Sequence, residues 1–287
     1  MKRLRDFVES FNYQDLVIFQ RAFTGLLLFF LIKNGYDTCM EVRYHQFQNA
    51  NGLMQFIPQV FFQFEAYVFS YIFLILMCIF SLIFPLKWFL MAPVTLLYIL
   101  CMGVSETLFT TYGHQFFHVK STLIAPLIAI TLASFLSKDL IPKRSIHYGL
   151  PIVFTHFSLA LIYLGPNIKR MVSAGFPGWY SGDTLRIYLI ESSILFHNPI
   201  SLWMAQSLAL CMALQFFVLL FETTFWTGLF FPKLLRFSLI SALCFHLGVE
   251  VLMRANYLDY FLCLFTIFVT RPYRMRIYSG KKTQELV

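Results

Sequence analysis

Ionisable residues within apolar stretches are the part of this sequence best placed to do chemistry. His246, Glu250 and Arg254 follow one another at intervals of four residues, in and just beyond the apolar stretch 236–253. This spacing puts their side chains on one face of a helix, and charged groups at membrane depth usually face the interior of a bundle. We therefore expect either a polar wall that leads down from the outer membrane surface or three residues that pair and fix helix packing.

His114 and His118 are also four residues apart. The same spacing holds zinc in metalloproteases, but Gln115 stands where that motif has glutamate, and the sequence offers no evident third ligand. We expect no metal here. A histidine at the mouth of a span is better suited to hydrogen bonding or acid–base work, and the alternative for His118 is an interface residue without a catalytic role.

The stretch from Tyr163 to Arg186 contains two prolines and four glycines. We expect the preceding helix to end at Gly165 and the backbone beyond it to be irregular. Lys169 then lies near the membrane boundary. In an apolar pocket a lysine loses solvation and acts more readily as a neutral base, whereas the alternative is an ordinary lysine that reaches from the span end to water. The glycines around Trp179 favour a loop that folds back over Lys169.

The composition indicates how these residues must be positioned. The 287 residues are 59% hydrophobic and 13% charged, with a mean hydropathy of +0.69, whereas soluble domains carry about 25% charged residues. The sequence therefore predicts an all-α, polytopic transmembrane bundle. The net charge of +8 comes from basic residues at span ends and tails, which favours membrane topology over nucleic-acid binding. The six cysteines show no paired motif, so we expect no disulfide framework.

Eight spans position the candidate residues within one domain, 1–287. We predict spans at 16–32, 66–84, 88–104, 121–136, 148–165, 200–221, 236–253 and 257–270. Between them we expect a polar loop at 33–65, a tight turn at 85–87, an interfacial helix at 187–199 and a connector at 222–235. With the N-terminus inside, fourteen Lys and Arg residues are cytoplasmic and seven are outside. This bias predicts that both termini lie in the cytoplasm.

Several segments, read in order, resemble one membrane-protein family. They are LVIFQRAFTGLLLFF, HVKSTLIAPLIAI, HFSLALIYLGPNIKR, GWYSGDTLR, FETTFWTGLFFPKLLR and CFHLGVEVLM. They lie between Leu16 and Met253. The ordered set resembles, over about Leu16 to Thr270, the HTTM family, the membrane domain related to vitamin K-dependent gamma-carboxylase. The match is to the membrane portion, as in short bacterial relatives. The resemblance therefore implies a multi-pass protein of a bacterial inner or cytoplasmic membrane.

The resemblance also implies roles for particular residues. Lys169 matches the catalytic base that deprotonates the hydroquinone, and His118 matches an active-site histidine. In the carboxylase, oxygenation of reduced vitamin K yields a strong base that removes a glutamate gamma proton, after which carbon dioxide adds. We accordingly expect reduced vitamin K or another quinol as cofactor and a secreted peptide as substrate. The residues assigned to cofactor binding are Trp179, His114, His246, Glu250 and Arg254.

Three functions remain open from the sequence. The first is a carboxylase-like membrane enzyme that modifies a secreted peptide. The second is a non-catalytic membrane partner for the export, maturation or immunity of such a peptide. The third is a small transporter, which we disfavour because the sequence shows no repeated set of spans and no pair of interrupted helices.

Overall fold

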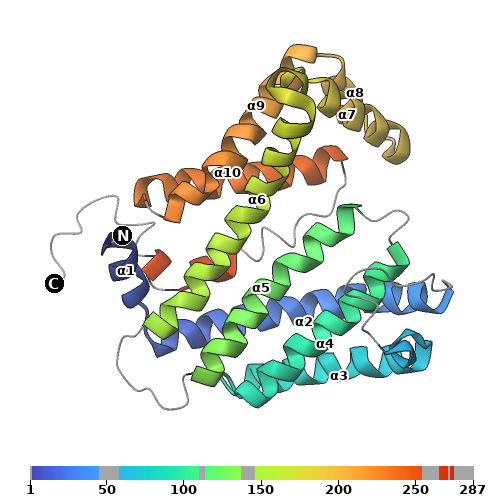
Figure 1. Ribbon diagram of the computed structural model, residues 1–287. Coiled ribbons are helices and arrows are strands. Elements are labelled where there is room, and N and C mark those ends of the chain that lie inside the picture. Colours follow the sequence, from blue (N-terminus) through green and yellow to red (C-terminus); the bar gives the residue numbers. More distant parts are fainter. Residues whose placement is uncertain are drawn as a thin grey trace. The chain divides into compact units, whose positions relative to one another are not determined.

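The computed structural model describes residues 2–44, 58–109, 114–136, 146–229, 231–253, 265–270 and 272–274. Every regular element in these ranges is a helix (Figure 1), in agreement with the predicted all-α class. The helices form two compact units. Unit 1 comprises Met1–Thr155 and Thr266–Tyr273, and unit 2 comprises His156–Phe265 and Arg274–Val287.

Five helices in the described ranges are long and apolar enough to cross a membrane. They are Tyr13–Met40, Phe64–Ile83, Ile146–Gly165, Leu208–Gly228 and Leu234–Met253. Trp88–Val104 and Leu123–Leu136 are apolar but shorter, and most of the predicted span 257–270 lies outside the described residues. The protein is therefore helical with several potential membrane spans. The count of eight and the cytoplasmic termini stay predictions.

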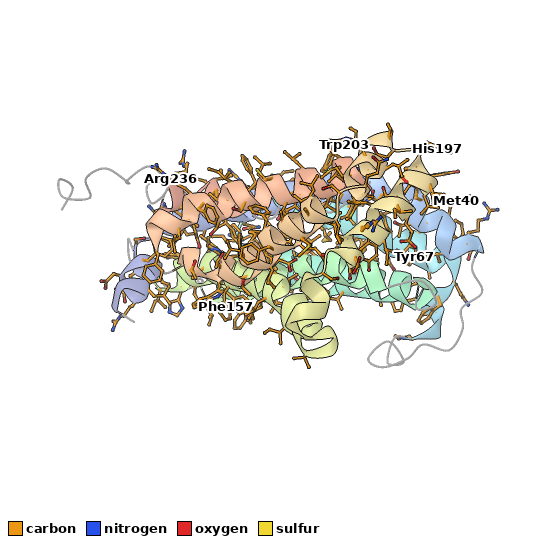
Figure 2. All side chains as sticks on the ribbon, turned by 90° about the horizontal axis from the view of Figure 1, so that it is seen from above. Met40, Tyr67, Phe157, His197, Trp203 and Arg236 are labelled. Carbon is orange, nitrogen blue, oxygen red and sulfur yellow. The ribbon has the colours of Figure 1, made fainter. Side chains whose placement is uncertain are left out.

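Unit 1 is built from successive helices, and the long helices between Tyr13 and Leu136 pack on their neighbours in the chain. They are α1 (Lys2–Glu9), α2 (Tyr13–Tyr44), the 3-10 helix η2 (Gln59–Phe62), α3 (Phe64–Ile83), α4 (Trp88–Phe109), α5 (His114–Leu136) and the beginning of α6 (Ile146–Tyr180). Met40 near the end of α2 and Tyr67 near the beginning of α3 lie at the same end of this unit (Figure 2), as expected for antiparallel neighbours. The prediction of a loop directly after Ile32 is wrong, because α2 continues to Tyr44. No proline occurs between these points to stop it.

The predicted turn between α3 and α4 is confirmed, and a buried glutamine holds it. Leu86 adopts a left-handed backbone with φ of 56°, and its N–H donates to Gln20 Oε1 over 2.6 Å. Gln20 Nε2 donates in turn to Ser81 Oγ at 2.9 Å. The Gln20 side chain of α2 therefore forms hydrogen bonds both to the backbone of the turn and to a side chain near the end of α3.

Replacing Gln20 with methionine should lower stability. Methionine keeps the length of the side chain but leaves the Leu86 N–H buried without its acceptor, which costs about 1–3 kcal/mol. Thermal unfolding of the purified protein in detergent measures this. Thr24→Val, one turn further along α2, is the matched control. The Thr24 hydroxyl is buried without a hydrogen-bond partner in the described part of the chain, so its loss should be neutral or slightly stabilising. Equal destabilisation by both substitutions would contradict the assignment.

Helix α1 packs directly on the backbone of the first turns of α6. A Cβ atom added at Gly149 would lie 2.1 Å from the carbonyl oxygen of Val8 and 2.8 Å from the ring of Phe11. Phe11 is fully buried, with its ring centroid 5.9 Å from that of Tyr273. The absence of a side chain at Gly149 therefore allows the N-terminal helix to join the core of unit 1.

Helix α6 overturns the prediction that regular structure ends at Gly165. It runs unbroken from Ile146 to Tyr180, past Pro166 and Pro177. A proline inside a helix costs about 3 kcal/mol, but the residues between the two prolines include Lys169, Arg170 and Ala174, all of them good helix formers. Continuing the helix is the less costly choice. The chain turns only at Gly182, whose φ of 83° suits a glycine.

Unit 2 consists of the rest of α6 with α7 (Asp183–Phe196), α8 (Pro199–Ala205), α9 (Leu208–Thr224), η4 (Phe225–Leu229) and α10 (Pro232–Met253). The predicted span 200–221 is wrong at its beginning, because the chain breaks between α8 and α9. Ser207 caps α9 by accepting from the N–H of Leu210 at 3.3 Å. This capping stabilises a fresh helix start. The predicted helix at 187–199 is present as α7, shifted toward the N-terminus.

The α7–α8 hairpin covers the C-terminal end of α10. Ser192 and Ser201 both donate hydroxyl hydrogen bonds to the carbonyl of Leu252, and Asn198 Nδ2 donates to the carbonyl of Val251 at 2.7 Å. The last carbonyls of a helix generally lack a donor from the helix itself, and the hairpin supplies donors to these two. His197 and Trp203 of the hairpin lie at the opposite end of unit 2 from Arg236 (Figure 2).

Candidate functional site

The most distinctive polar contact within the potential spans joins Tyr163 and His246. The Tyr163 hydroxyl lies 2.6 Å from His246 Nε2, and both side chains are buried. Tyr163 comes from α6 and His246 from α10, both in unit 2 and both within helices long enough to span a membrane. Either atom can be the donor, since the tautomer of the imidazole decides the direction.

Three phenylalanines surround this pair. The ring centroid of Tyr163 lies 4.9 Å from that of Phe225 and 5.1 Å from that of Phe221, in edge-to-face geometry. The Phe245 ring lies 5.1 Å from the His246 ring. We call Tyr163, His246, Phe221, Phe225 and Phe245 the intramembrane cluster. Its apolar walls keep water away, and a hydrogen bond is electrostatically stronger in such surroundings.

More buried polar residues lie on the helices that form the cluster. His156 precedes Tyr163 by two helical turns on α6, with its ring centroid 5.4 Å from that of Phe225. Glu222 follows Phe221 directly and is buried. Gln215, two turns before Glu222 on α9, is also buried. Ionisable and polar side chains at this depth are rare unless they have a role in binding or proton transfer.

The inward orientation expected for these residues of α10 is met by His246 but not by Glu250, and the polar wall itself stays a prediction. His246 is 4% exposed, whereas Glu250 is exposed. The hairpin and α9 cover the side of α10 that carries Leu252, which packs against buried Leu189 and Ala205. Glu250 is two residues away, so it points to the opposite side of the helix. Arg254 lies outside the described residues.

The remaining predicted site residues are placed only through their backbones. Lys169 and Trp179 lie on the extended part of α6, so the prediction that Lys169 sits on irregular backbone is wrong. His114 and His118 lie in the first turns of α5, although the predicted span begins only at residue 121. The side chains of all four lie outside the described part of the structure. Lys169 belongs to unit 2 and His118 to unit 1, and their predicted approach stays a prediction.

Sequence reasoning missed Tyr163, His156 and Gln215 as site residues. A spacing of seven residues was the available signal, since it places two side chains on one face of a helix. His156 and Tyr163 have this spacing on α6, and Gln215 and Glu222 have it on α9. Tyr163 fell within the predicted span 148–165, but its spacing from His156 was not used.

The arrangement can hold and relay a proton in a dry environment. A hydroxyl and an imidazole each donate and accept, so a proton can pass along their hydrogen bond in either direction. Among the described residues no group of three His, Cys, Asp or Glu side chains is arranged to hold a metal ion. Comparison with protein-family models, curated proteins and solved structures finds no match for this chain. The HTTM resemblance accordingly rests on the quoted segments alone.

Proposed function

We propose that this protein is a membrane-embedded enzyme of the carboxylase-like type, which uses a lipid-soluble quinol to modify a secreted peptide at the outer face. The observation that supports this most is the buried Tyr163–His246 hydrogen bond within potential membrane spans. A polar pair at this depth usually marks a substrate or proton path. A molecule that reaches this pair through the bilayer must itself be lipid-soluble.

The chemical types of the residues in the intramembrane cluster are compatible with a bound quinol. The aromatic walls of the intramembrane cluster are suited to a flat ring, and the hydroxyl–imidazole pair is suited to an ionisable phenol. When bound, the quinol would supply the ring that is oxidised and the hydroxyl that is deprotonated.

Within this proposal each residue has a limited task. Tyr163 and His246 hold the head group and move a proton away from its hydroxyl. The three phenylalanines exclude water, which strengthens the electrostatic interactions inside the site. Lys169, six residues after Tyr163 on the same helix, lies about 9 Å further along the axis. There it acts as the final acceptor of that proton, which is the role of base that the resemblance assigns to it.

Replacing Lys169 with alanine or with arginine should abolish activity. Alanine removes the amine, and arginine keeps the charge but cannot be deprotonated in a protein. Activity is measured as the quinol-dependent incorporation of labelled carbon dioxide into a glutamate-containing peptide by reconstituted protein. We expect a loss of about a hundredfold or more for both variants, as is typical when a general base is removed.

Arg170→Lys is the matched control, because it changes the neighbouring cation and leaves Lys169 in place. It should keep close to full activity and normal membrane insertion. If Lys169→Arg keeps full biological activity, the lysine acts only as a charge. The chain is then better explained as a non-catalytic membrane partner of a secreted peptide.

A further inference from the structure

Gln215 is a buried side chain whose hydrogen-bonding groups are not explained by the fold. It is 4% exposed, and neither its Oε1 nor its Nε2 has a hydrogen-bond partner in the part of the chain that the structure describes. It lies within Leu208–Gly228, one of the helices able to span a membrane. Buried polar groups are nearly always paired in folded proteins, and each exception requires an explanation.

The orientation of Gln215 rules out contact with lipid as that explanation. On α9, Cys211 one turn before it and Leu219 one turn after it are buried, whereas the neighbouring Phe216 and Leu220 are exposed. The carboxamide therefore lies on the covered face of the helix. Glu222 lies on this face two turns later.

A second buried glutamine, Gln20, shows the hydrogen bonding expected of an amide with a structural role. Gln20 of unit 1 is fully buried, and both its amide atoms are paired, Oε1 with the Leu86 N–H and Nε2 with Ser81 Oγ. Gln215 is buried to a similar degree but has neither kind of partner among the described residues. The difference indicates that the partner of Gln215 comes from outside the fold.

We propose that Gln215 is a ligand-binding residue of the membrane domain and that its carboxamide binds the oxygen of a neutral, lipid-soluble head group. The identification of this head group as a quinone or quinol rests on the proposed function above. A carboxamide suits both forms of such a ligand. Nε2 donates to a quinone carbonyl, and Oε1 accepts from a quinol hydroxyl, with no change of charge. A neutral partner is also the less costly choice at membrane depth.

Gln215→Met separates this role from a structural one, because binding and stability should change in opposite directions. Removing a buried amide that lacks partners should raise the Tm of the ligand-free protein by about 2–4 °C. Losing the hydrogen bond to the ligand should weaken the binding of phylloquinone about tenfold or more. Both quantities are measured on full-length protein in nanodiscs, by thermal unfolding without ligand and with increasing phylloquinone.

Two controls make the measurement specific. Gln206→Met removes an exposed amide of the same unit and should alter neither Tm nor binding. Phytol, which has the tail of phylloquinone without its ring, should give wild type and Gln215→Met the same small shift.

Each remaining outcome overturns a defined statement. If wild type binds phylloquinone and Gln215→Met binds it equally well, Gln215 is not a ligand residue, while the proposed function stands. If Gln215→Met lowers Tm or fails to fold, the amide is satisfied inside the protein, as by a buried water, and the inference is wrong. If wild type does not bind phylloquinone beyond the phytol level, the quinol function fails and the inference fails with it.

Discussion

Gly149→Ala should detach the N-terminal helix from unit 1 and destabilise the protein. The new Cβ would lie 2.1 Å from the carbonyl oxygen of Val8, a backbone atom that cannot rotate away. Overpacking of this kind typically costs about 1–3 kcal/mol. We expect a lower Tm together with faster proteolysis of α1, because displacement of α1 relieves the clash while the apolar helices remain. Limited proteolysis followed by mass spectrometry identifies the exposed segment.

Gly248→Ala is the control for the substitution itself. A Cβ at Gly248 meets nothing within 4 Å, and alanine is favoured over glycine inside a helix by about 1 kcal/mol. This variant should be as stable as wild type or slightly more so. A Gly149→Ala protein with unchanged Tm and a protected N-terminus would show that α1 does not pack where the structure places it.

Tyr163→Phe should remove most of the activity while leaving the helices in place. The substitution deletes only the hydroxyl, so the aromatic packing against Phe221 and Phe225 survives. His246 loses the 2.6 Å hydrogen bond at its Nε2, which costs about 1–3 kcal/mol of stability. If the pair moves a proton, quinol-dependent activity should fall about a hundredfold. The peptide-labelling assay and thermal unfolding together measure both effects.

Tyr188→Phe is the matched control, because Tyr188 lies on α7 of the same unit and is exposed. It should change neither activity nor Tm. The double variant Tyr163→Phe with His246→Leu tests the partnership directly, since residues in contact show coupling of about 0.5–3 kcal/mol in a double-mutant cycle. Additive effects of the two substitutions on stability would show that the hydrogen bond does not stabilise the fold.

The elements that could be predicted from the sequence are those in which hydrophobic pattern and turn residues indicate the same structure as the tertiary packing. The turn at 85–87 and the spans 66–84, 148–165 and 236–253 have close counterparts in the structure. The end of α6 was mispredicted because Pro166 is a strong local signal for the end of a helix, and the helix-forming residues that follow it outweigh that signal. The opposite error occurred at 200–221. There a continuous apolar run concealed the break between α8 and α9 that the Ser207 cap indicates.

The candidate site was predictable only in part. Periodicity identified His246 as an inward-facing residue, but it assigned the same orientation to Glu250, because spacing alone does not show where a covering helix ends. The burial of Tyr163 and Gln215 depends on packing between segments that are far apart in the chain. The buried amide of Gln20 has hydrogen-bond partners, whereas that of Gln215 has none among the described residues. Tertiary structure determines this difference, so the residue type alone cannot predict it.

The hydrogen bonds from the α7–α8 hairpin to Leu252 and Val251 also couple the local unfolding of the hairpin to that of the end of α10. Ser192, Asn198 and Ser201 donate to carbonyls 51 to 60 residues away, so the last turn of α10 cannot fray without breaking the bonds that hold the hairpin. Segments joined in this way exchange their amide hydrogens with solvent as one cooperative unit. Protection of the hairpin amides therefore reports on the end of α10, the helix that carries His246.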